Sequence, residues 1–374
     1  MSLSPPTQSR RLTMVITELD VGGAEKAFVR VAIGLQNLGW DVRVVSLRDA
    51  GPLATLLEAA NIEVSALQAG GLLDVRAIWR LRRELLCRPA DVLLTFLHQA
   101  NLVGRIAGRL AGVRRIVCGI RVADRRLVVR LPERLTKGMV DRYVAVSQSV
   151  GELHRNICQI DPDRMMTILN GVDLEAIDAA VPATRSEMGC KPDDQVILCV
   201  GRLSKQKAPL DALEAFHLML SSFPELKLRA RLLFIGEGEL RPELQRRVDE
   251  LGLHHSVQLP GWRPDVWRLM KSANALVLAS HWEGLPNVIM EAQAAGLPVV
   301  ATAVDGSHEL IRDHLTGRLV PRGDINALAN ALGEILQNNA VAALMSRTAR
   351  SHVAEHHHWS TCIEQYDELL NALL

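Results

Sequence analysis

The sequence predicts an α/β fold with two doubly wound parallel sheets, one in each of two domains. Short aliphatic runs alternate with longer segments of helical periodicity, and the alternation restarts after a segment rich in Pro, Asp and small residues at 173–193. A length of 374 residues also suits two domains. Strand–helix alternation favours parallel sheets covered by helices on both faces. Because ligands of such sheets bind beyond the carboxyl ends of the strands, we expect a site in a cleft between the domains.

In the first half, strands and helices follow one another in regular order. The expected strands are 12–17, 41–47, 62–66, 91–96, 115–118 and 142–146. The expected helices are 24–38, 53–60, 73–86 and 101–110. Gly39 follows the first of these helices, where glycine commonly ends a helix. These elements form an expected first domain, 1–178.

The second half repeats the pattern and forms an expected domain 179–354. Its expected strands are 195–200, 231–235, 257–259, 275–279 and 299–302. Its expected helices are 208–220, 243–251, 266–271 and 287–295, and segment 308–312 continues the alternation.

Composition excludes several classes of function. A net charge of +1 and an aromatic content of 3% give no support to nucleic-acid binding. The charge is uneven, because residues 1–170 carry a net +8 and the remainder a net −7. The basic half suits either an anionic partner or an ordinary solvated surface, and both readings stay open.

Cysteine usage and hydropathy indicate the compartment. No two of the six cysteines have C-x-x-C spacing, which argues against zinc and dithiol sites and favours buried thiols in a reducing compartment. Residues 1–11 are polar, and charged residues interrupt the apolar run that follows, so neither a signal peptide nor a membrane span is expected. We expect a cytoplasmic protein.

The strongest chemical signal is the segment 280–301, which follows an apolar strand. Gly284, Leu285 and Pro286 predict a tight turn after Glu283, and Pro286 with Asn287 suits a helix start. Glu291 then lies one turn into the helix. The backbone N–H groups of a helix start favour an anion such as a diphosphate, and nearby glutamates accept hydrogen bonds from sugar hydroxyls.

This segment resembles the E-x7-E motif of retaining glycosyltransferase family 4, a family with the GT-B fold of two Rossmann-like domains. Glu283 and Glu291 are separated by seven residues, and the flanking Gly-Leu-Pro and Ala-x-x-Ala-Gly-x-Pro-Val-Val-Ala text matches as well. The resemblance implies that Glu283 holds the transferred sugar and Glu291 the ribose. It places the donor-binding turn at Gly284, Leu285, Pro286 and Asn287.

Further segments of the second half carry the same resemblance. Gly201-Arg202-Leu203-Ser204-Lys205-Gln206-Lys207 is similar to the family's G-R-L-x-x-x-K segment, which implies that Arg202 and Lys207 clamp the donor diphosphate. Gly236 and Gly238 resemble the glycine turn after the next strand, where backbone approaches the nucleotide. Trp262 falls in the family's base-binding region and serves either there or in packing.

The first half completes the resemblance. Gly22 and Gly23 lie in a G-G-A-E segment whose N–H groups are expected to bind the diphosphate. His98 follows a predicted strand at the same edge of the sheet. Many relatives carry a histidine near the sugar after the next strand, where this chain has Gly119-Ile120-Arg121, as do some branches that extend bacterial surface glycans. Arg121 therefore either replaces that histidine or binds acceptor phosphate.

The resemblance also implies the chain's organisation. Asn170-Gly171-Val172-Asp173 is similar to the family's hinge before the second domain, and the last helix, about 355–374, is expected to return to the first.

The expected reaction is retaining transfer of a hexose or N-acetylhexosamine from a nucleotide sugar, most simply a UDP-sugar, to a glycan or lipid-linked glycan acceptor. Without a D-x-D motif in place, no cofactor or essential divalent metal is expected. Two alternatives remain open: a nucleotide-sugar-binding regulatory protein without turnover, and a UDP-sugar epimerase of the same fold.

Two basic stretches, 76–88 and 121–137, suit peripheral contact with an anionic membrane at the inner face of the cytoplasmic membrane, or are ordinary helix surfaces.

Overall fold

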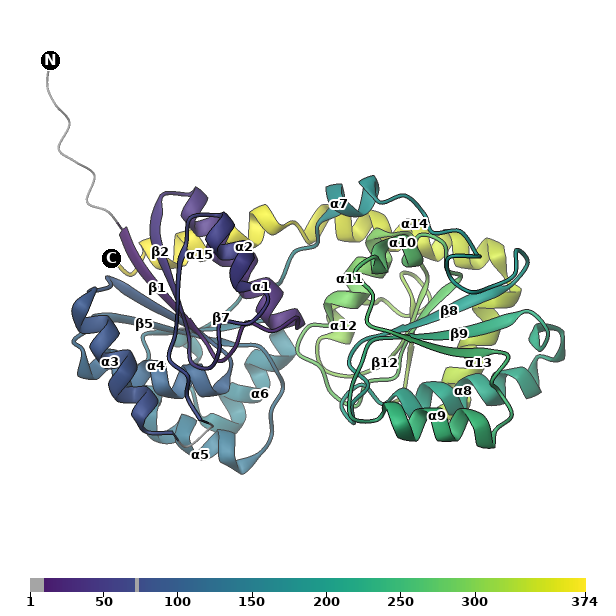
Figure 1. Cartoon of the computed structure of the whole chain (residues 1–374), viewed down its shortest axis with the longest axis horizontal. Coiled ribbons are helices and arrows are strands. Elements are labelled where there is room, and N and C mark those ends of the chain that lie inside the picture. The colour runs from purple at the N-terminus through teal and green to yellow at the C-terminus, as the bar shows by residue number, and fades with distance from the viewer. Residues whose placement is uncertain (1–9, 71–73) are drawn as a thin grey trace, which may run out of the picture. The chain divides into compact units, whose positions relative to one another are not determined.

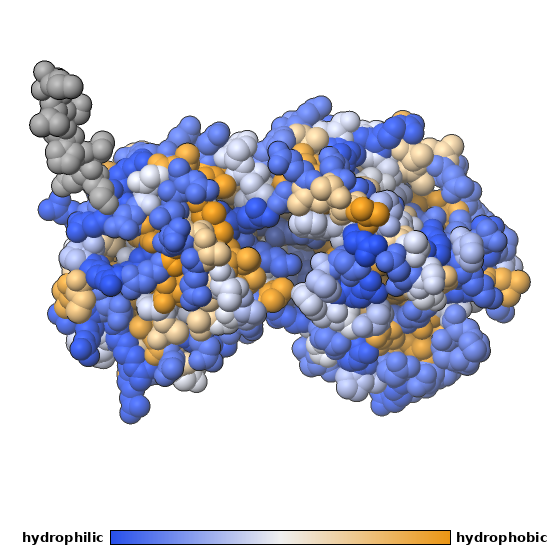
Figure 2. All heavy atoms as spheres, turned by 45° about the horizontal axis from the view of Figure 1, so that its top comes forward, coloured by the Kyte–Doolittle hydropathy of each residue, from blue (hydrophilic) through white to orange (hydrophobic). Residues whose placement is uncertain are grey.

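The computed structural model describes residues 10–70 and 74–374 (Figure 1). The chain forms two compact units, of which the first is Met1–Gly171 with Trp359–Leu374 and the second is Val172–His358. The structure thus changes unit at 171/172, where the sequence suggested 178/179. Residue 73, the expected start of one helix, lies outside the described residues. In the view of Figure 2, hydrophilic residues dominate the surface of both units, and apolar residues appear there in patches.

The first unit is built on a parallel sheet of seven strands in the order β3-β2-β1-β4-β5-β6-β7. The strands are β1 (Arg10–Ile16), β2 (Trp40–Ser46), β3 (Glu63–Ala66), β4 (Val92–Phe96), β5 (Arg115–Ile120), β6 (Arg142–Ala145) and β7 (Met165–Thr167). The central strand β4 is buried along its whole length. A continuous apolar run is what a strand covered on both faces requires.

Helices cover both faces of this sheet (Figure 1). One face carries α1 (Gly23–Asn37) and α15 (Trp359–Asn371), which pack with the strand side chains Leu12, Met14 and Ile16. The remaining helices are α2 (Ala54–Ala59), α3 (Arg76–Cys87), α4 (His98–Leu110), α5 (Leu127–Thr136) and α6 (Gln148–Cys158), with short 3-10 turns η1 (Lys137–Met139) and η2 (Pro162–Arg164). Of these, α3, α4, α5 and α6 lie side by side in that order on the opposite face.

The second unit has a parallel sheet of six strands in the order β10-β9-β8-β11-β12-β13. Its strands are β8 (Gln195–Val200), β9 (Ala230–Ile235), β10 (Val257–Gly261), β11 (Ala275–Leu278), β12 (Val299–Thr302) and β13 (Arg318–Val320). Its helices are α7 (Leu174–Ala179), α8 (Pro209–Ser222), η3 (Pro224–Leu226), α9 (Arg241–Glu250), α10 (Val266–Met270), α11 (Asn287–Ala294), α12 (Ser307–Leu310), α13 (Ile325–Gln337) and α14 (Asn339–His356). The core around Phe216, Phe234 and Leu332 fixes α8 and α13 on one face of the sheet.

The chain passes between the units twice, and the two passages lie side by side. The N–H of Val172 donates to the carbonyl of His357 at 2.9 Å, and Val172 pairs with His358 in an isolated bridge. Beyond this point α15 belongs to the first unit, where Asp367 accepts a hydrogen bond from Trp40 Nε1 at 2.6 Å. A C-terminal segment thereby completes the N-terminal unit.

Candidate functional site

The sheet order of the second unit creates a switch point at strand β8. The chain runs from β8 to β9 in one direction, and β11 lies on the other side of β8. The loops after β8 and β11 therefore diverge at the carboxyl edge of the sheet, which is where open α/β sheets bind ligands. Lys207 belongs to the first of these loops and Glu283 to the second.

An ion pair joins the two loops. Lys207 Nζ lies 2.6 Å from Glu283 Oε1, and Ser280 Oγ donates to the same oxygen at 2.6 Å. Glu283 is buried, whereas Lys207 keeps some contact with solvent. A buried carboxylate needs such partners, because an unpaired charge in a dry site is costly. The ion pair thus gives the site one ordered carboxylate, Glu283, and one cation, Lys207.

Backbone contacts hold the same two loops together. The N–H of His281 donates to the carbonyl of Gln206 at 2.8 Å, and Gln206 Nε2 donates to the carbonyl of Trp282 at 3.1 Å. His281 Nε2 also lies 2.9 Å from Asp211 Oδ2 at the start of α8. These bonds fix Glu283 relative to Lys207.

A third loop, after β12, supports Glu283 from its backbone side. Asp305 Oδ2 accepts the N–H of Glu283 at 3.1 Å. Asp305 has φ +31°, a conformation uncommon for a residue with a side chain. The next residue, Gly306, lies so close to Gly284 that a Cβ there would meet the Gly284 carbonyl oxygen at 2.2 Å. The β12 loop therefore shapes the turn that carries Glu283.

Two large side chains of the site face solvent. Arg202 is exposed, and its guanidinium has no hydrogen-bond or ion-pair partner among the described residues. Trp262, directly after β10, is 58% exposed. Core packing therefore does not account for Trp262, and both side chains remain available to a ligand at this edge.

The glycines of the site serve close packing between loops. Gly201 has φ +152°, and a Cβ at Gly236 would lie 2.0 Å from the Gly201 carbonyl oxygen. A Cβ at Gly238 would lie 2.3 Å from the carbonyl oxygen of Leu203. The sequence assigned Gly236 and Gly238 to nucleotide approach. In the structure their close neighbour is the β8 loop, so their first role is to seat that loop.

Helix α11 begins as expected. It starts at Asn287 with Pro286 as its N-cap, and Gly296 follows its end with φ +74°. Gly284, Leu285 and Pro286 are buried, whereas Asn287 and Glu291 are half-buried. The turn is thus part of the core, and Glu291 lies one turn into the helix.

The first unit has an equivalent switch point between β1 and β4. Gly22 is the N-cap of α1, which begins at Gly23 after β1. The Glu25 carboxylate folds back on this start, since a Cβ on Gly22 would lie 2.1 Å from Glu25 Oε2. A carboxylate of the chain itself thus lies beside the N–H groups that were expected to face a diphosphate.

His98 lies at the same edge, as the first residue of α4 after β4. The preceding Leu97 has φ +75°, an outlier for a bulky residue. Burial lowers the pKa of His98, so the ring is neutral near pH 7. Its Nε2 is buried without a hydrogen-bond partner among the described residues. An orphaned buried nitrogen at a strand edge is a feature that functional sites often show.

Arg121 follows β5 and is buried rather than open to a substrate. Its Nη2 donates to Asn170 Oδ1, and its guanidinium lies 4.8 Å from the ring centroid of Phe96. Burial raises the pKa of the Tyr366 hydroxyl well above its ordinary value, although Arg121 opposes the shift. Arg121 therefore ties the β5 end to the segment that leaves the first unit, and its Nε is buried without a hydrogen-bond partner among the described residues.

Comparison with known proteins identifies the family. Residues 21–176 match the model of Glycosyltransferase Family 4, and residues 181–352 match the model of Glycosyl transferases group 1. The chain is a glycosyltransferase of this family. Its two parallel-sheet Rossmann-like units are those of the GT-B fold.

Two curated relatives and one solved structure show what this glycosyltransferase is similar to. It is 27% identical to the UDP-Gal:alpha-D-GlcNAc-diphosphoundecaprenol alpha-1,3-galactosyltransferase of Escherichia coli, over 85% of this chain and 86% of that protein. It is 28% identical to a D-inositol 3-phosphate glycosyltransferase of Thermobispora bispora, over 90% and 86%. Anabaena HepE in complex with UDP and glucose superposes with a TM-score of 0.84 at 20% identity, over 97% of this chain and all of that one.

Across residues 10–70 and 74–374, the glycosyltransferase groups no three His, Cys, Asp or Glu side chains in a way that suits a metal ion. Within the same ranges, no helix combines the length and apolar character that crossing a bilayer requires. All six cysteines are free, and four of them are buried.

Sequence reasoning missed two features of this glycosyltransferase. Asp305 was not singled out, although an aspartate between a strand end and Gly306 is a weak local signal for a loop with an unusual backbone. Glu25 was counted in its motif without a role. Both act through loops whose contacts only the folded chain brings together.

Proposed function

We propose that this glycosyltransferase moves a sugar from a UDP-sugar to a glycan or lipid-linked glycan, with retention at the anomeric carbon. The observation that carries the proposal is the Lys207–Glu283 pair at the β8/β11 switch point, with the exposed Arg202 in the same loop as Lys207. The named activity of the E. coli relative, which uses a UDP-sugar and a diphosphate-linked lipid, supports the choice of donor and acceptor. The complexes of HepE with UDP and with glucose support the donor.

In the proposed reaction the bond from the anomeric carbon to the diphosphate oxygen breaks, and a bond from that carbon to the acceptor oxygen forms on the same face. The acceptor's proton passes to the departing diphosphate, so no second carboxylate is needed as a base. The protein's contribution is to hold the reactants and to stabilise charge on the leaving group. Arg202 and Lys207 supply that positive charge.

Glu283 orients the sugar. Its bonds to Lys207 and Ser280 both use Oε1, and its Oε2 serves a sugar hydroxyl. Glu291 holds the ribose, and the exposed Trp262 marks the place of the base. His98, neutral near pH 7, offers a hydrogen bond to the sugar without adding charge. Since cationic side chains suffice for the diphosphate, we propose that turnover needs no divalent metal or other cofactor.

The acceptor and its location follow from the first unit's charge. Residues 1–170 carry a net +8, which suits an acceptor that bears a lipid diphosphate and a place at the cytoplasmic face of an anionic membrane. Assembly of a cell-surface polysaccharide or lipopolysaccharide is a process that consumes such products.

The deciding experiment incubates the protein with UDP-galactose, UDP-glucose or UDP-N-acetylglucosamine and a short-chain GlcNAc-diphosphate lipid, with excess EDTA. We expect release of UDP only when acceptor is present, and an α-linked product by NMR. UDP release that ignores the acceptor, a β-linked product, or activity that disappears in EDTA and returns with Mn²⁺ would each refute the corresponding part of the proposal.

A further inference from the structure

Helix α5 carries its apolar side chains on the outside of the first unit. Leu127, Val128, Leu131 and Leu135 are 72%, 48%, 59% and 76% exposed. At 100° per residue these four positions fall within an arc of about 100° on the helix surface. A helix of a water-soluble domain normally turns such an arc toward the core.

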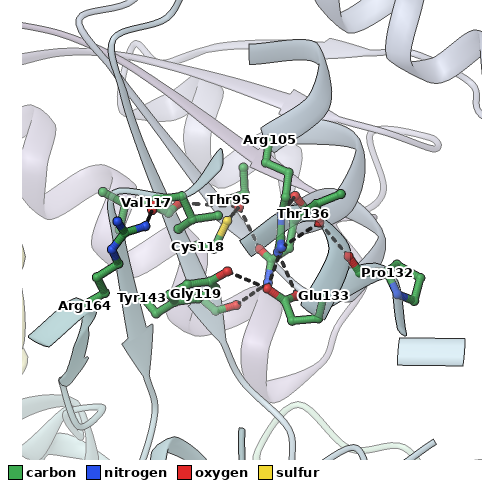
Figure 3. Close-up of polar contacts among 12 residues, drawn as sticks. Thr95, Arg105, Val117, Cys118, Gly119, Pro132, Glu133, Thr136, Tyr143 and Arg164 are labelled. Atoms are coloured by element: carbon green, nitrogen blue, oxygen red, sulfur yellow. Dashed lines mark hydrogen bonds and ion pairs between the residues drawn. The ribbon is translucent and has the colours of Figure 1, made fainter. Parts of the chain in front are cut away.

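The inner side of α5 buries one apolar and one charged residue, Val129 and Glu133. Glu133 is buried and accepts a hydrogen bond from Arg105 Nη2 on α4 at 2.8 Å, and Tyr143 on β6 donates to Glu133 Oε1 at 2.7 Å. Arg105 Nη1 also donates to Thr136 Oγ1 at 3.2 Å. Figure 3 shows Arg105 and Glu133 lying against each other within this cluster. The helix is thus attached through Val129 and a desolvated ion pair, whereas the four residues of the apolar arc stay on the outside.

Positive charge flanks the apolar arc. Residues 125–139 contain five Arg or Lys and one Asp or Glu, the buried Glu133, and one of the five cations, Arg126, pairs with Asp124. Arg134 and Lys137 both bond to the neutral oxygens of Gln159, so no carboxylate neutralises them. Arg130 is on the same flank as Arg134 on the helix surface.

From the exposed apolar arc and its flanking cations we propose that α5 is the surface by which the protein docks on an anionic bilayer. The apolar arc enters the boundary between headgroups and acyl chains, and the flanking cations meet lipid phosphates. The proposal deepens the proposed function, because it rests on a lipid-linked acceptor and names the membrane contact. A second copy of the chain fits the surface less well, since its own flank of cations would repel it.

The basic helix α3, which the sequence also suggested, is less suited to this role. Arg80 Nη1 donates to the carbonyl of Leu67 at 2.7 Å, and Arg82 Nε donates to the carbonyl of Leu110 at 3.0 Å. Two of its cations therefore serve the fold, and its leucines Leu81 and Leu85 are buried.

The test is co-sedimentation with phosphatidylglycerol/phosphatidylcholine vesicles at low and high salt. The variant Leu127→Ser/Leu131→Ser/Leu135→Ser is compared with a control, Leu228→Ser/Leu315→Ser/Leu344→Ser, which removes three exposed leucines of the second unit. We expect wild type and control to bind in a salt-sensitive way, and the α5 variant to bind about tenfold or more weakly. Unchanged circular dichroism and UDP affinity would show that the variant is folded.

Several outcomes overturn the proposal. They are no vesicle binding by the wild type at low salt, α5-variant binding equal to the control, or binding lost in Arg80→Ser/Arg82→Ser/Arg83→Ser but kept in the α5 variant. Sedimentation velocity that shows a wild-type dimer abolished by the α5 variant would assign the arc to a second copy. Failure of the proposed function gives a different result, namely vesicle binding without sugar transfer.

Discussion

At the scale of single residues, one charge pair organises the donor side. Glu283 is buried and Lys207 is its cation, so each depends on the other for its position. Removing the lysine removes charge from the leaving group and leaves the glutamate without its counterion.

We expect Lys207→Ala to lower kcat/KM about a hundredfold, which corresponds to a barrier higher by about 2–3 kcal/mol. The reason is that the transition state loses one positive charge that the protein holds in place. The exposed neighbour Lys205 provides the control, since Lys205→Ala keeps the loop sequence and removes a cation that has no partner in the described structure. Steady-state kinetics on both variants is the measurement. Equal activity of the two variants would refute the assignment.

Asp305 is expected to position Glu283 through the backbone N–H of that residue. Asparagine keeps an oxygen acceptor and tolerates positive φ, so Asp305→Asn should stay within a fewfold of wild-type kcat. Glycine adopts the positive φ without strain but removes the acceptor. Asp305→Gly should therefore lower kcat about tenfold, and the variant should melt near the wild-type temperature.

His314→Gly, at φ +62° in an exposed loop of the same unit, controls for backbone relief alone and should leave kcat unchanged. A wild-type kcat for Asp305→Gly would mean that the hydrogen bond does not matter.

At the scale of elements, the sequence predicted those helix ends that the local residue types determine. Helix α11 begins at Asn287 and stops before Gly296 because Pro and Asn favour a helix start and Gly favours a helix end. Strands β7 and β13 were missed because each has three residues, and Met-Met-Thr or Arg-Leu-Val becomes a strand only beside a neighbour.

The functional residues also fall into two groups, those that the sequence indicates and those that only the fold reveals. Its motif residues stand out in the sequence, but the Asp305 contact and the inward-facing Glu133 of α5 do not. Each depends on a partner more than twenty residues away, Glu283 for one and Arg105 for the other.

Acid should weaken the first unit. Burial lowers the pKa of His98 on α4 and of His154 on α6, so both are neutral in the folded state while their unfolded forms titrate at about 6.5. Their contribution to the free energy of unfolding is present above the unfolded pKa and is lost as pH falls below it, because the unfolded chain binds protons first. The loss is about 1.4 kcal/mol per pH unit for each histidine.

Urea denaturation at pH 7.5 and pH 5.5 checks this, with His98→Asn and His154→Asn expected to flatten the dependence. Glu133 adds nothing in this window. Burial favours its neutral form, but Arg105 outweighs that effect and holds the Glu133 pKa below its ordinary value, so its contribution is lost only at more acidic pH. Histidine variants with the wild-type slope would show that other groups cause the loss.

At the scale of the whole molecule, sequence order and structural membership differ. Helix α15 lies after all of the second unit in the chain, yet its Tyr366, Leu369 and Leu370 belong to the core of the first unit. Lys207, Glu283 and Trp262, which we propose to hold the donor, belong to the second unit. A destabilising change in the C-terminal helix should therefore loosen the first unit, far away in sequence, and leave donor binding unchanged.

Leucines of equal burial make this testable. Leu370 on α15 and Leu332 on α13 are both fully buried, and either change to Ala should cost about 2–5 kcal/mol through the lost contacts and the cavity left behind. In native-state hydrogen exchange, Leu370→Ala should speed exchange in β1, β2 and α1 and keep UDP affinity. Leu332→Ala should speed exchange in β8, β11 and β12 and weaken UDP binding, because there the folding loss and the ligand share one unit. If Leu370→Ala instead loosened the second unit, or both variants loosened both units equally, the units would not unfold separately, and α15 would stabilise the molecule as a whole.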